Sequence, residues 1–238
     1  ILYYDGTIKN VEDVKQGDIL MGDDSTPRNV LELCNNSDEM FVINPSYGES
    51  YTVNKLHKLV LKNTNTKQIE EITVENYITK DDEWKSSMKL FKTGVEFEEK
   101  LIDMEPYEYG RKCKDNIPHN LKCNSRNNRI KLLAGLLDNY GYYNNDFFSF
   151  VHSSEQMIGD VIFLTRSLGF KSYITESCIA ERDSLFVLHI YGNFIELPCK
   201  QWNVLIDTLD NDYLSSDFIV KSIGHGDYYG FTLDENHR

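Results

Sequence analysis

The chain has 238 residues, of which 40% are hydrophobic and 26% are charged, and its formal net charge is −13. This length and apolar content predict one large or two modest globular domains, and 5 Pro with 14 Gly argue against collagen-like or proline-rich sequence. The longest apolar runs fall short of the roughly 20 residues that a membrane-spanning helix needs, so we expect a soluble protein without membrane contact.

Five cysteines stand at wide, irregular intervals, an odd number that fits no disulfide framework and favours a reducing, intracellular setting. Cys113, His119 and Cys123 lie close together in the sequence, but no Cys-x-x-Cys pair accompanies them, so we expect no metal site there. The chain opens at Ile1 without an initiator Met or a leader pattern. We therefore expect the natural start to lie upstream.

The first 61 residues predict an all-β region, because short apolar stretches alternate with turn signals. The predicted strands cover residues 18–22, 40–43, 51–53 and 57–62. The turn signals lie at residues 5–6, 16–18, 22–24, 35–37 and 46–48.

The middle of the chain predicts a mixture of helices and strands. Two short helices are expected at 74–79 and 84–90 and a strand at 95–97, followed by a domain boundary near residue 105 and an Asn-rich loop at 115–128. Beyond the loop, spacing, caps and β-branched runs predict helices at 129–140 and 153–168 and strands at 147–151, 171–176 and 185–191.

The end of the chain returns to β character, with strands expected at 218–223 and 228–233 joined by a turn at 224–227. A β-rich start and a β-rich end around a mixed middle predict one β domain interrupted by a small α/β insert. The predicted divisions are residues 1–105, 106–205 and 206–238.

A cluster of basic residues stands out against the negative total. Seven Lys and Arg against one acid lie between Arg111 and Lys131. One interpretation is a solvated loop and helix start; the other is a strip that contacts a DNA backbone, with Arg126, Arg129 and Lys131 as the candidate contacts.

Three segments at the two ends of the chain resemble the splicing blocks of inteins. They are Ile1–Thr7 with Val11–Val14 and Gly17-Asp18, then Ser50–Leu59, and finally Asp227–Arg238. The resemblance implies a Hint-fold splicing domain in which His57 promotes the acyl shift of an upstream Cys or Ser, and His237 assists cyclisation of a terminal Asn. Asn54 stands where the family usually has Thr, and the sequence contains neither reacting junction residue.

The resemblance also implies that splicing needs no cofactor and acts on flanking host segments, the exteins, in cis. We expect a monomer whose location follows that of the host protein, inside the cell. Neither junction is present in this sequence, so we expect no reaction in the chain as given.

Leu133–Gly141 resembles the second helix of a LAGLIDADG (DOD-type) homing endonuclease. The family places a carboxylate at the foot of this helix to hold Mg²⁺, and here Tyr140 occupies that position; Asp138 lies at a position that normally serves the helix interface. A phenol that is neutral at pH 7 does not replace an anionic ligand.

Pro106–Asn116 resembles the first such helix and keeps an acid at Asp115. Its apolar positions have become charged, so we expect the helix pair not to form and the first DNA-binding subdomain to be deleted. The substituted positions are Glu108, Arg111, Lys112 and Lys114.

The insert therefore reads as a degenerate, LAGLIDADG-like α+β remnant within the β-rich Hint domain, and Phe147–Pro198 resembles its second subdomain. Autoprocessing ranks first among the functions. A structural remnant with weak DNA binding ranks second, and an active nuclease, the only alternative that would need Mg²⁺, ranks last.

Overall fold

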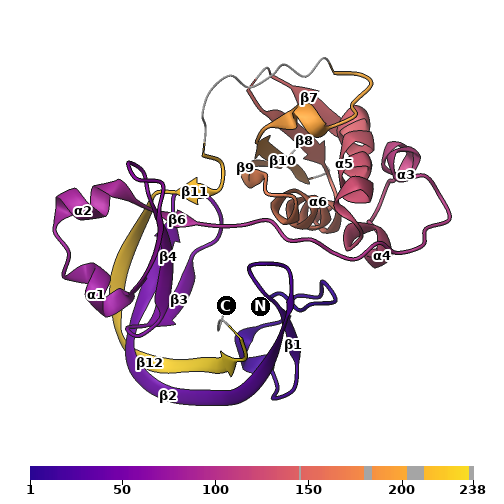
Figure 1. Ribbon diagram of the computed structural model, residues 1–238. Helices are drawn as coiled ribbons and strands as arrows, with labels where there is room; N and C mark the ends of the chain where they lie inside the picture. Colours follow the sequence, from indigo (N-terminus) through magenta and orange to yellow (C-terminus); the bar gives the residue numbers. More distant parts are fainter. Residues whose placement is uncertain (145, 180–183, 203–211, 236–238) are drawn as a thin grey trace. The chain divides into compact units, whose positions relative to one another are not determined.

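The computed structural model describes residues 1–144, 146–179, 184–202 and 212–235. The chain divides into two compact units (Figure 1): unit 1 comprises Ile1–Thr93 and Leu214–Arg238, and unit 2 comprises Gly94–Tyr213. The sequence placed these divisions near residues 105 and 205. Residues from Gly94 onward belong to unit 2 because the Val95 amide donates to the carbonyl of Ser167.

Unit 1 is built on a long antiparallel ribbon of two curved strands, β2 (Pro27–Pro45) and β12 (Phe218–Leu233) (Figure 1). β1 (Ile19–Met21) pairs with the first residues of β2, and β3 (Tyr51–Asn54) pairs with residues 40–43.

The turns predicted at 35–37 and 224–227 are wrong, because both segments lie inside this ribbon. Residues 35–37 pair with residues 227–229, and residues 224–227 pair with residues 37–40, so that the ladder satisfies their backbone groups. A bulge between Ser222 and Gly224 absorbs the irregularity, and Gly224 has a φ of 87° that favours glycine.

The second sheet of unit 1 is also antiparallel. Its strands, in spatial order, are β11 (Ser215–Ser216), β6 (Met88–Phe91), β4 (Lys58–Asn63) and β5 (Ile69–Thr73). Short helices α1 (Val74–Ile78) and α2 (Asp82–Ser87) join β5 to β6, capped by Thr73 and Asp81. The helix predicted at 84–90 is therefore wrong beyond Ser87, where the apolar residues Met88 and Leu90 enter β6.

Two small cores lie in unit 1. The sheet that contains β4 shares one core with α1 and part of β2: Phe41, Ile43, Leu59, Leu61, Val74, Tyr77, Met88 and Leu90. The other core joins the first residues of the chain to the end of β12: Tyr3, Val14, Leu20, Val30 and Leu233. A 3-10 turn, η1 (Val11–Asp13), closes the N-terminal segment.

Unit 2 is an α+β body with one antiparallel sheet. The strands, in spatial order, are β7 (Gly141–Tyr143), β8 (Phe148–His152), β10 (Ser184–Tyr191) and β9 (Lys171–Ile179). Helices α5 (Arg126–Tyr140) and α6 (Glu155–Ser167) pack on one face of it, around a core that includes Leu133, Phe150, Met157 and Leu188. A short helix, α4 (His119–Lys122), interrupts the predicted loop, and η2 (Phe194–Glu196) follows the last strand.

The predicted strand at 95–97 pairs with no described strand. The prediction of a β-rich fold is confirmed. Among the residues that the structure describes, all the strand pairs of both units are antiparallel. No helix in these residues is long and apolar enough to cross a membrane.

The expectation that the two LAGLIDADG-like helices do not pair is wrong. α3 (Pro106–Lys112) packs along α5, and glycines stand at the crossing: a Cβ added to Gly135 would lie 2.1 Å from the carbonyl oxygen of Tyr107. The charges of α3 do not oppose this, because Tyr107 and Gly110 are buried while Glu108 and Arg111 keep solvent contact. The interface uses one face of the short helix. Glu108 and Lys112 lie outside it, and the Arg111 guanidinium reaches across it to donate to the carbonyl of Asp138 at 3.5 Å.

The ends of unit 2 leave unit 1 at neighbouring points. The Lys92 amide donates to the carbonyl of Leu214 at 2.8 Å, and β11 pairs with β6 at Ser215 and Phe91. We therefore expect removal of residues 94–213, with a short Gly-Ser linker in their place, to leave unit 1 folded, because closing so short a gap costs little chain entropy. Circular dichroism should show a β spectrum and a cooperative thermal transition.

The matched control is a deletion that starts at Met88 and so removes β6. This variant should lose the transition, because Met88 and Leu90 belong to the core of unit 1. Loss of the transition in the shorter deletion as well would contradict the independence of unit 1.

Candidate functional site

A cleft of about 760 Å³ opens in unit 1. It is lined by the first residues of the chain, by β3 and the turn that follows it, by β4 and β5, and by the last part of β12. The residues that line the cleft include Ile1, Lys9, Tyr51, His57, Lys58, Glu71, Tyr229 and Phe231. The cleft therefore brings together all three parts of the sequence that carry the splicing-block resemblance.

His57 lies in this cleft on a tight turn, and its backbone is fixed on both sides. The His57 amide donates to the carbonyl of Asn54 at 3.2 Å, and the His57 carbonyl accepts from the amide of Val74 at 3.0 Å. Lys55, inside the turn, donates its amide to Glu39 of β2 and pairs its ammonium group with Asp38 at 3.0 Å. The local sequence thus holds the histidine on a rigid support.

His57 lines the cleft and is exposed to solvent. The surrounding atoms nevertheless desolvate it, and this burial lowers the pKa of His57 below its usual 6.5. The neutral ring, able to accept a proton at one nitrogen and donate from the other, therefore predominates at pH 7.

Asn54, predicted as a second catalytic residue, is half-buried at the end of β3, opposite Met40 in the ladder. Its carbonyl closes the His57 turn. The structure shows Asn54 as the base of the turn, and its side chain does not line the cleft.

Ile1 lies at the cleft and exchanges two hydrogen bonds with the backbone of Lys9. Its ammonium group donates to the Lys9 carbonyl at 2.6 Å, and the Lys9 amide donates to the Ile1 carbonyl at 3.0 Å. Burial lowers the pKa of the Ile1 ammonium group below its usual 8.0. These two hydrogen bonds with Lys9 thus hold the first residue beside the cleft.

His237 lies outside the described residues. The strand that leads toward it is well anchored, since Leu233 is in the core and Asp234 accepts from the Asn29 amide and side chain at 2.8 and 2.7 Å. These hydrogen bonds, chiefly that from the Asn29 side chain, lower the pKa of Asp234.

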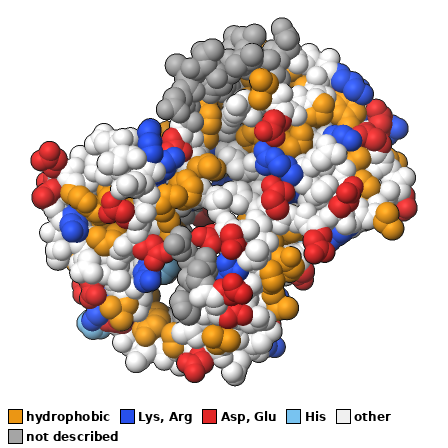
Figure 2. Space-filling view, in the orientation of Figure 1, with side chains coloured by type: hydrophobic (Ala, Val, Ile, Leu, Met, Phe, Trp, Pro, Cys, Tyr) orange, Lys and Arg blue, Asp and Glu red, His pale blue; other side chains and the backbone are white. Residues whose placement is uncertain are grey.

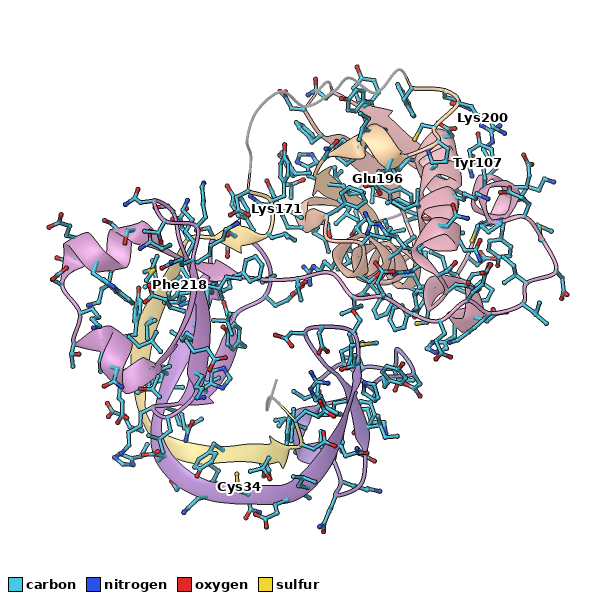
Figure 3. All side chains as sticks on the ribbon, in the orientation of Figure 1. Cys34, Tyr107, Lys171, Glu196, Lys200 and Phe218 are labelled. Atoms are coloured by element: carbon cyan, nitrogen blue, oxygen red, sulfur yellow. The ribbon has the colours of Figure 1, made fainter. Side chains whose placement is uncertain are left out.

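The three predicted endonuclease residues lie in unit 2 and do not form a metal site. Asp138 is buried, and its carboxylate accepts from the Tyr107 hydroxyl at 2.7 Å and from the amides of Lys200 and Gln201 at 2.6 and 3.1 Å. Figure 3 shows Tyr107 and Lys200 side by side, with the Lys200 ammonium 3.9 Å from the ring centre.

Tyr140 is also hydrogen-bonded within unit 2: its hydroxyl donates to the carbonyl of Cys113 at 2.8 Å. Asp115 alone is an exposed carboxylate. Mg²⁺ needs near-octahedral oxygen ligands that include one or two carboxylates, so these residues do not fit the ion. More generally, no cluster of three or more His, Cys, Asp or Glu in the described part of the chain could hold a metal.

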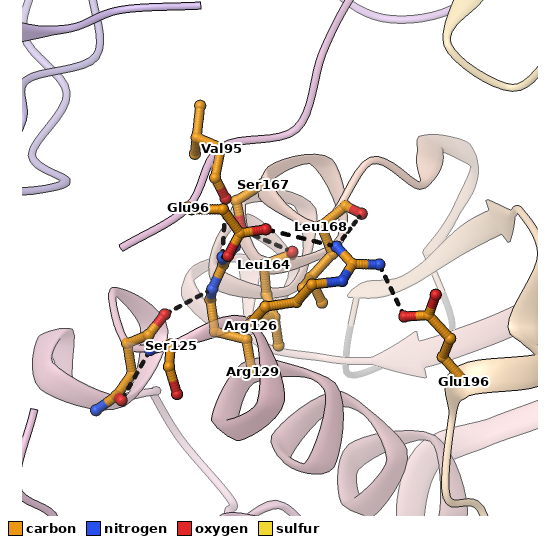
Figure 4. A network of polar contacts seen from close by, with 10 residues as sticks. Val95, Glu96, Ser125, Arg126, Arg129, Leu164, Ser167, Leu168 and Glu196 are labelled. Carbon is orange, nitrogen blue, oxygen red and sulfur yellow. Dashed lines mark hydrogen bonds and ion pairs between the residues drawn. The ribbon is translucent and has the colours of Figure 1, made fainter. Parts of the chain in front are cut away.

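Two of the three basic residues predicted to contact DNA, Arg126 and Arg129, form hydrogen bonds and ion pairs within unit 2 (Figure 4). Arg129 is fully buried, and its guanidinium donates to the carbonyls of Asn124 and Val95, to Ser167 and to Glu96. The prediction of Arg129 as a DNA contact is therefore wrong.

Arg126 donates to the carbonyl of Leu168 at 3.1 Å and pairs with Glu196 at 3.0 Å (Figure 4). Lys122 pairs with the buried Asp160. Lys131 is half-buried on α5, and no hydrogen bond or ion pair holds its ammonium group within the described residues. On the face shown in Figure 2, the Lys and Arg side chains of unit 2 lie among Asp and Glu and form no continuous basic strip.

Several residues of the cleft, including Tyr51, Glu71 and Tyr229, were not predicted as site residues from the sequence. The strand pattern held a signal for Tyr51, which lies in the same short block as His57. Glu71 and Tyr229 come from β5 and β12, and no local pattern indicates that these strands reach the same cleft.

Residues 1–93 match the family model described as the Hom_end-associated Hint domain. The matched range ends at Thr93, the residue at which the chain leaves unit 1. The match supports a Hint, intein-associated domain in this part of the chain, and the antiparallel β architecture of unit 1 is compatible with it. A search of curated proteins finds no match to the chain.

Proposed function

We propose that unit 1 is the body of an intein, which excises itself by an acyl shift at an upstream Cys or Ser, transesterification, and cyclisation of a downstream Asn. The observation that carries the proposal is the single cleft that holds His57, Ile1 and the last part of β12. Both ends of an excised segment have to approach one reaction centre, and the Hint match covers the residues that build most of its wall.

In the first step, the upstream side-chain sulfur or oxygen attacks the preceding carbonyl carbon. The new S–C or O–C bond replaces the C–N bond, and the released nitrogen gains a proton to become an amine. His57, neutral at pH 7, accepts the proton of the attacking group and returns it to the departing nitrogen. The fixed turn places its ring without a large reorganisation.

In the last step, the side-chain amide nitrogen of the terminal Asn attacks the backbone carbonyl carbon of the same residue. The new C–N bond closes a succinimide, the peptide bond to the next residue breaks, and the proton lost by the attacking nitrogen goes to the released amine. We propose that His237 assists this cleavage and that Asn54 supports the His57 turn. The steps use side chains and the peptide itself, so the proposed reaction needs no cofactor. The proposed partners are the host segments in cis, and the proposed location is that of an intracellular host protein, with the chain as a monomer.

The test is intact-mass analysis of the chain between two reporter proteins, with an upstream Cys block and a downstream block ending in His-Asn-Cys restored. Joined reporters and a free insert are the expected products. His57→Ala should slow the upstream cleavage by about 10²-fold or more, the usual contribution of a general acid–base group.

The matched control is His225→Ala, an exposed histidine of β12 outside the cleft, which should react as fast as the wild type. Upstream cleavage that proceeds equally fast in His57→Ala would remove His57 from the mechanism. Folded wild-type precursor that never reacts would rule out the splicing function.

We further propose that unit 2 is a homing-endonuclease remnant that does not cut DNA. The glycine crossing of α3 and α5 favours the nuclease origin, and the occupied oxygens of Asp138 and Tyr140 argue against Mg²⁺-dependent cleavage. Cutting of a plasmid that carries the empty host-gene site would contradict this, whereas a weak, salt-sensitive gel shift lost in Lys131→Ala would support residual DNA binding.

A further inference from the structure

Tyr51 is the aromatic neighbour of the His57 imidazole. The two ring centres lie 6.3 Å apart with an interplanar angle of 68°, an edge-to-face arrangement, and both side chains line the cleft. Within the described residues, the His57 ring makes no hydrogen bond, whereas its backbone makes two. The edge-to-face contact with Tyr51 therefore favours one orientation of the ring.

The two rings stand on separate, rigid supports. Tyr51 is the first residue of β3 and pairs with the fully buried Ile43 of β2. His57 is held by the turn that Asn54 and Val74 close. Because neither backbone moves easily, the Tyr51 ring limits the rotamers open to His57.

We propose that Tyr51 is a positioning residue for His57, whose ring keeps the imidazole directed into the cleft for the upstream acyl shift. The proposal rests on the splicing function proposed above. It assigns the role to the ring of Tyr51 and not to its hydroxyl group.

Charges of both signs line the cleft around the pair, including the Ile1 ammonium group, which donates to the Lys9 carbonyl. Lys58 and Glu71 form an ion pair at 3.1 Å in the cleft wall, and Lys9 and Glu12 face the cleft from the N-terminal segment. Burial is accordingly the cause that lowers the pKa of His57, and burial also raises the pKa of Tyr51. The phenol stays neutral over the range in which the imidazole titrates.

The experiment compares Tyr51→Leu with Tyr51→Phe, and with Tyr47→Leu as a matched control. Tyr47 and Tyr51 are each 37% exposed, but Tyr47 does not line the cleft. In the full chain, an NMR titration of His57 should move its pKa upward toward 6.5 in Tyr51→Leu, and leave it unchanged in the other two variants.

In the precursor with restored junctions, Tyr51→Leu should slow upstream cleavage by about 10-fold to 100-fold, as expected when a catalytic ring loses its orientation. Its rate profile should shift to higher pH, because a larger share of His57 is then protonated at pH 7. Tyr51→Phe should restore both the rate and the profile.

Unchanged His57 titration and rate in Tyr51→Leu would overturn the proposal. Equal slowing in Tyr51→Phe would also overturn it, because the hydroxyl would then carry the role. If the wild-type precursor does not react, the splicing function fails, yet the titration in the full chain still decides whether Tyr51 controls the environment of His57.

Discussion

Replacing Gly135 by alanine should destabilise unit 2 by about 3 kcal/mol or more, at the upper end of the cost of overpacking a core. The added Cβ would lie 2.1 Å from the Tyr107 carbonyl oxygen and 3.0 Å from the Arg111 amide nitrogen. These atoms belong to the backbone of α3, so no side chain can rotate away. The two helices have to separate, which opens the contact that Gly110 makes from the other side. Denaturant unfolding followed by circular dichroism measures the change.

The matched control is Gly159→Ala in α6. A Cβ at Gly159 would meet no heavy atom within 4 Å, and alanine is favoured over glycine in a helix by roughly 0.5–1 kcal/mol. The same substitution should therefore act with opposite signs at two helical positions of one unit. A Gly135→Ala variant as stable as the wild type would show that the helices do not pack this closely in solution.

The helices of unit 2 were largely predictable because their signals are local. Ser154 caps α6 by accepting from the Met157 amide, and Gly169 ends the helix region with a φ of 87°, as the sequence indicated. The pairing of α3 with α5 was not predictable from the charge of α3. The seven residues of α3 form about two helical turns, and Glu108 and Lys112 lie on the side away from α5. In so short a segment, the sequence does not show which residues face α5 and which face solvent.

The long ribbon of unit 1 was not predicted, because its strands pair over a long distance in the sequence and not through local signals. Asn35–Ser37 and Gly224–Asp227 carry residues that favour turns when they stand alone, but in the ladder the first segment pairs with residues 227–229 and the second with residues 37–40. Pairing across almost 190 positions of sequence leaves no local trace. His57, by contrast, was predicted as a functional residue from a compact block, and it lines the cleft. Its neighbours from β5 and β12 could not be predicted, because they reach the cleft through long-range strand pairing.

Replacing Arg129 by methionine should cost unit 2 about 3–5 kcal/mol, because each buried acceptor that loses its donor costs about 1–3 kcal/mol, and Arg129 donates to at least two of them, the Asn124 carbonyl and the Ser167 hydroxyl. The substitution keeps the volume of the side chain but leaves the carbonyls of Asn124 and Val95 without their donor. Burial already lowers the pKa of Arg129 to about 10, so the guanidinium is still charged at pH 7 and donates to each partner. Denaturant unfolding again provides the measurement.

Arg126→Met is the matched control on the same helix. The Arg126 side chain is 40% exposed, and its ion pair with Glu196 is open to solvent, so the loss should stay within about 1 kcal/mol. Arg129→Lys separates charge from geometry: an ammonium group retains the charge but cannot reach several acceptors at once, and a loss close to that of methionine would assign the stability to the hydrogen-bond fork. Full stability of the lysine variant would assign it to charge alone.

The different burial of the basic side chains on α5 decides which variants can test DNA binding by unit 2. Three of the basic residues between Arg111 and Lys131, namely Lys122, Arg126 and Arg129, form ion pairs within the fold with Asp160, Glu196 and Glu96, acids that lie far away in the sequence. A gel shift lost in Arg129→Ala would therefore report unfolding and not a missing phosphate contact. Lys131→Ala removes a charge that holds no described partner, and only a loss of binding with unchanged stability in that variant identifies a DNA contact on α5.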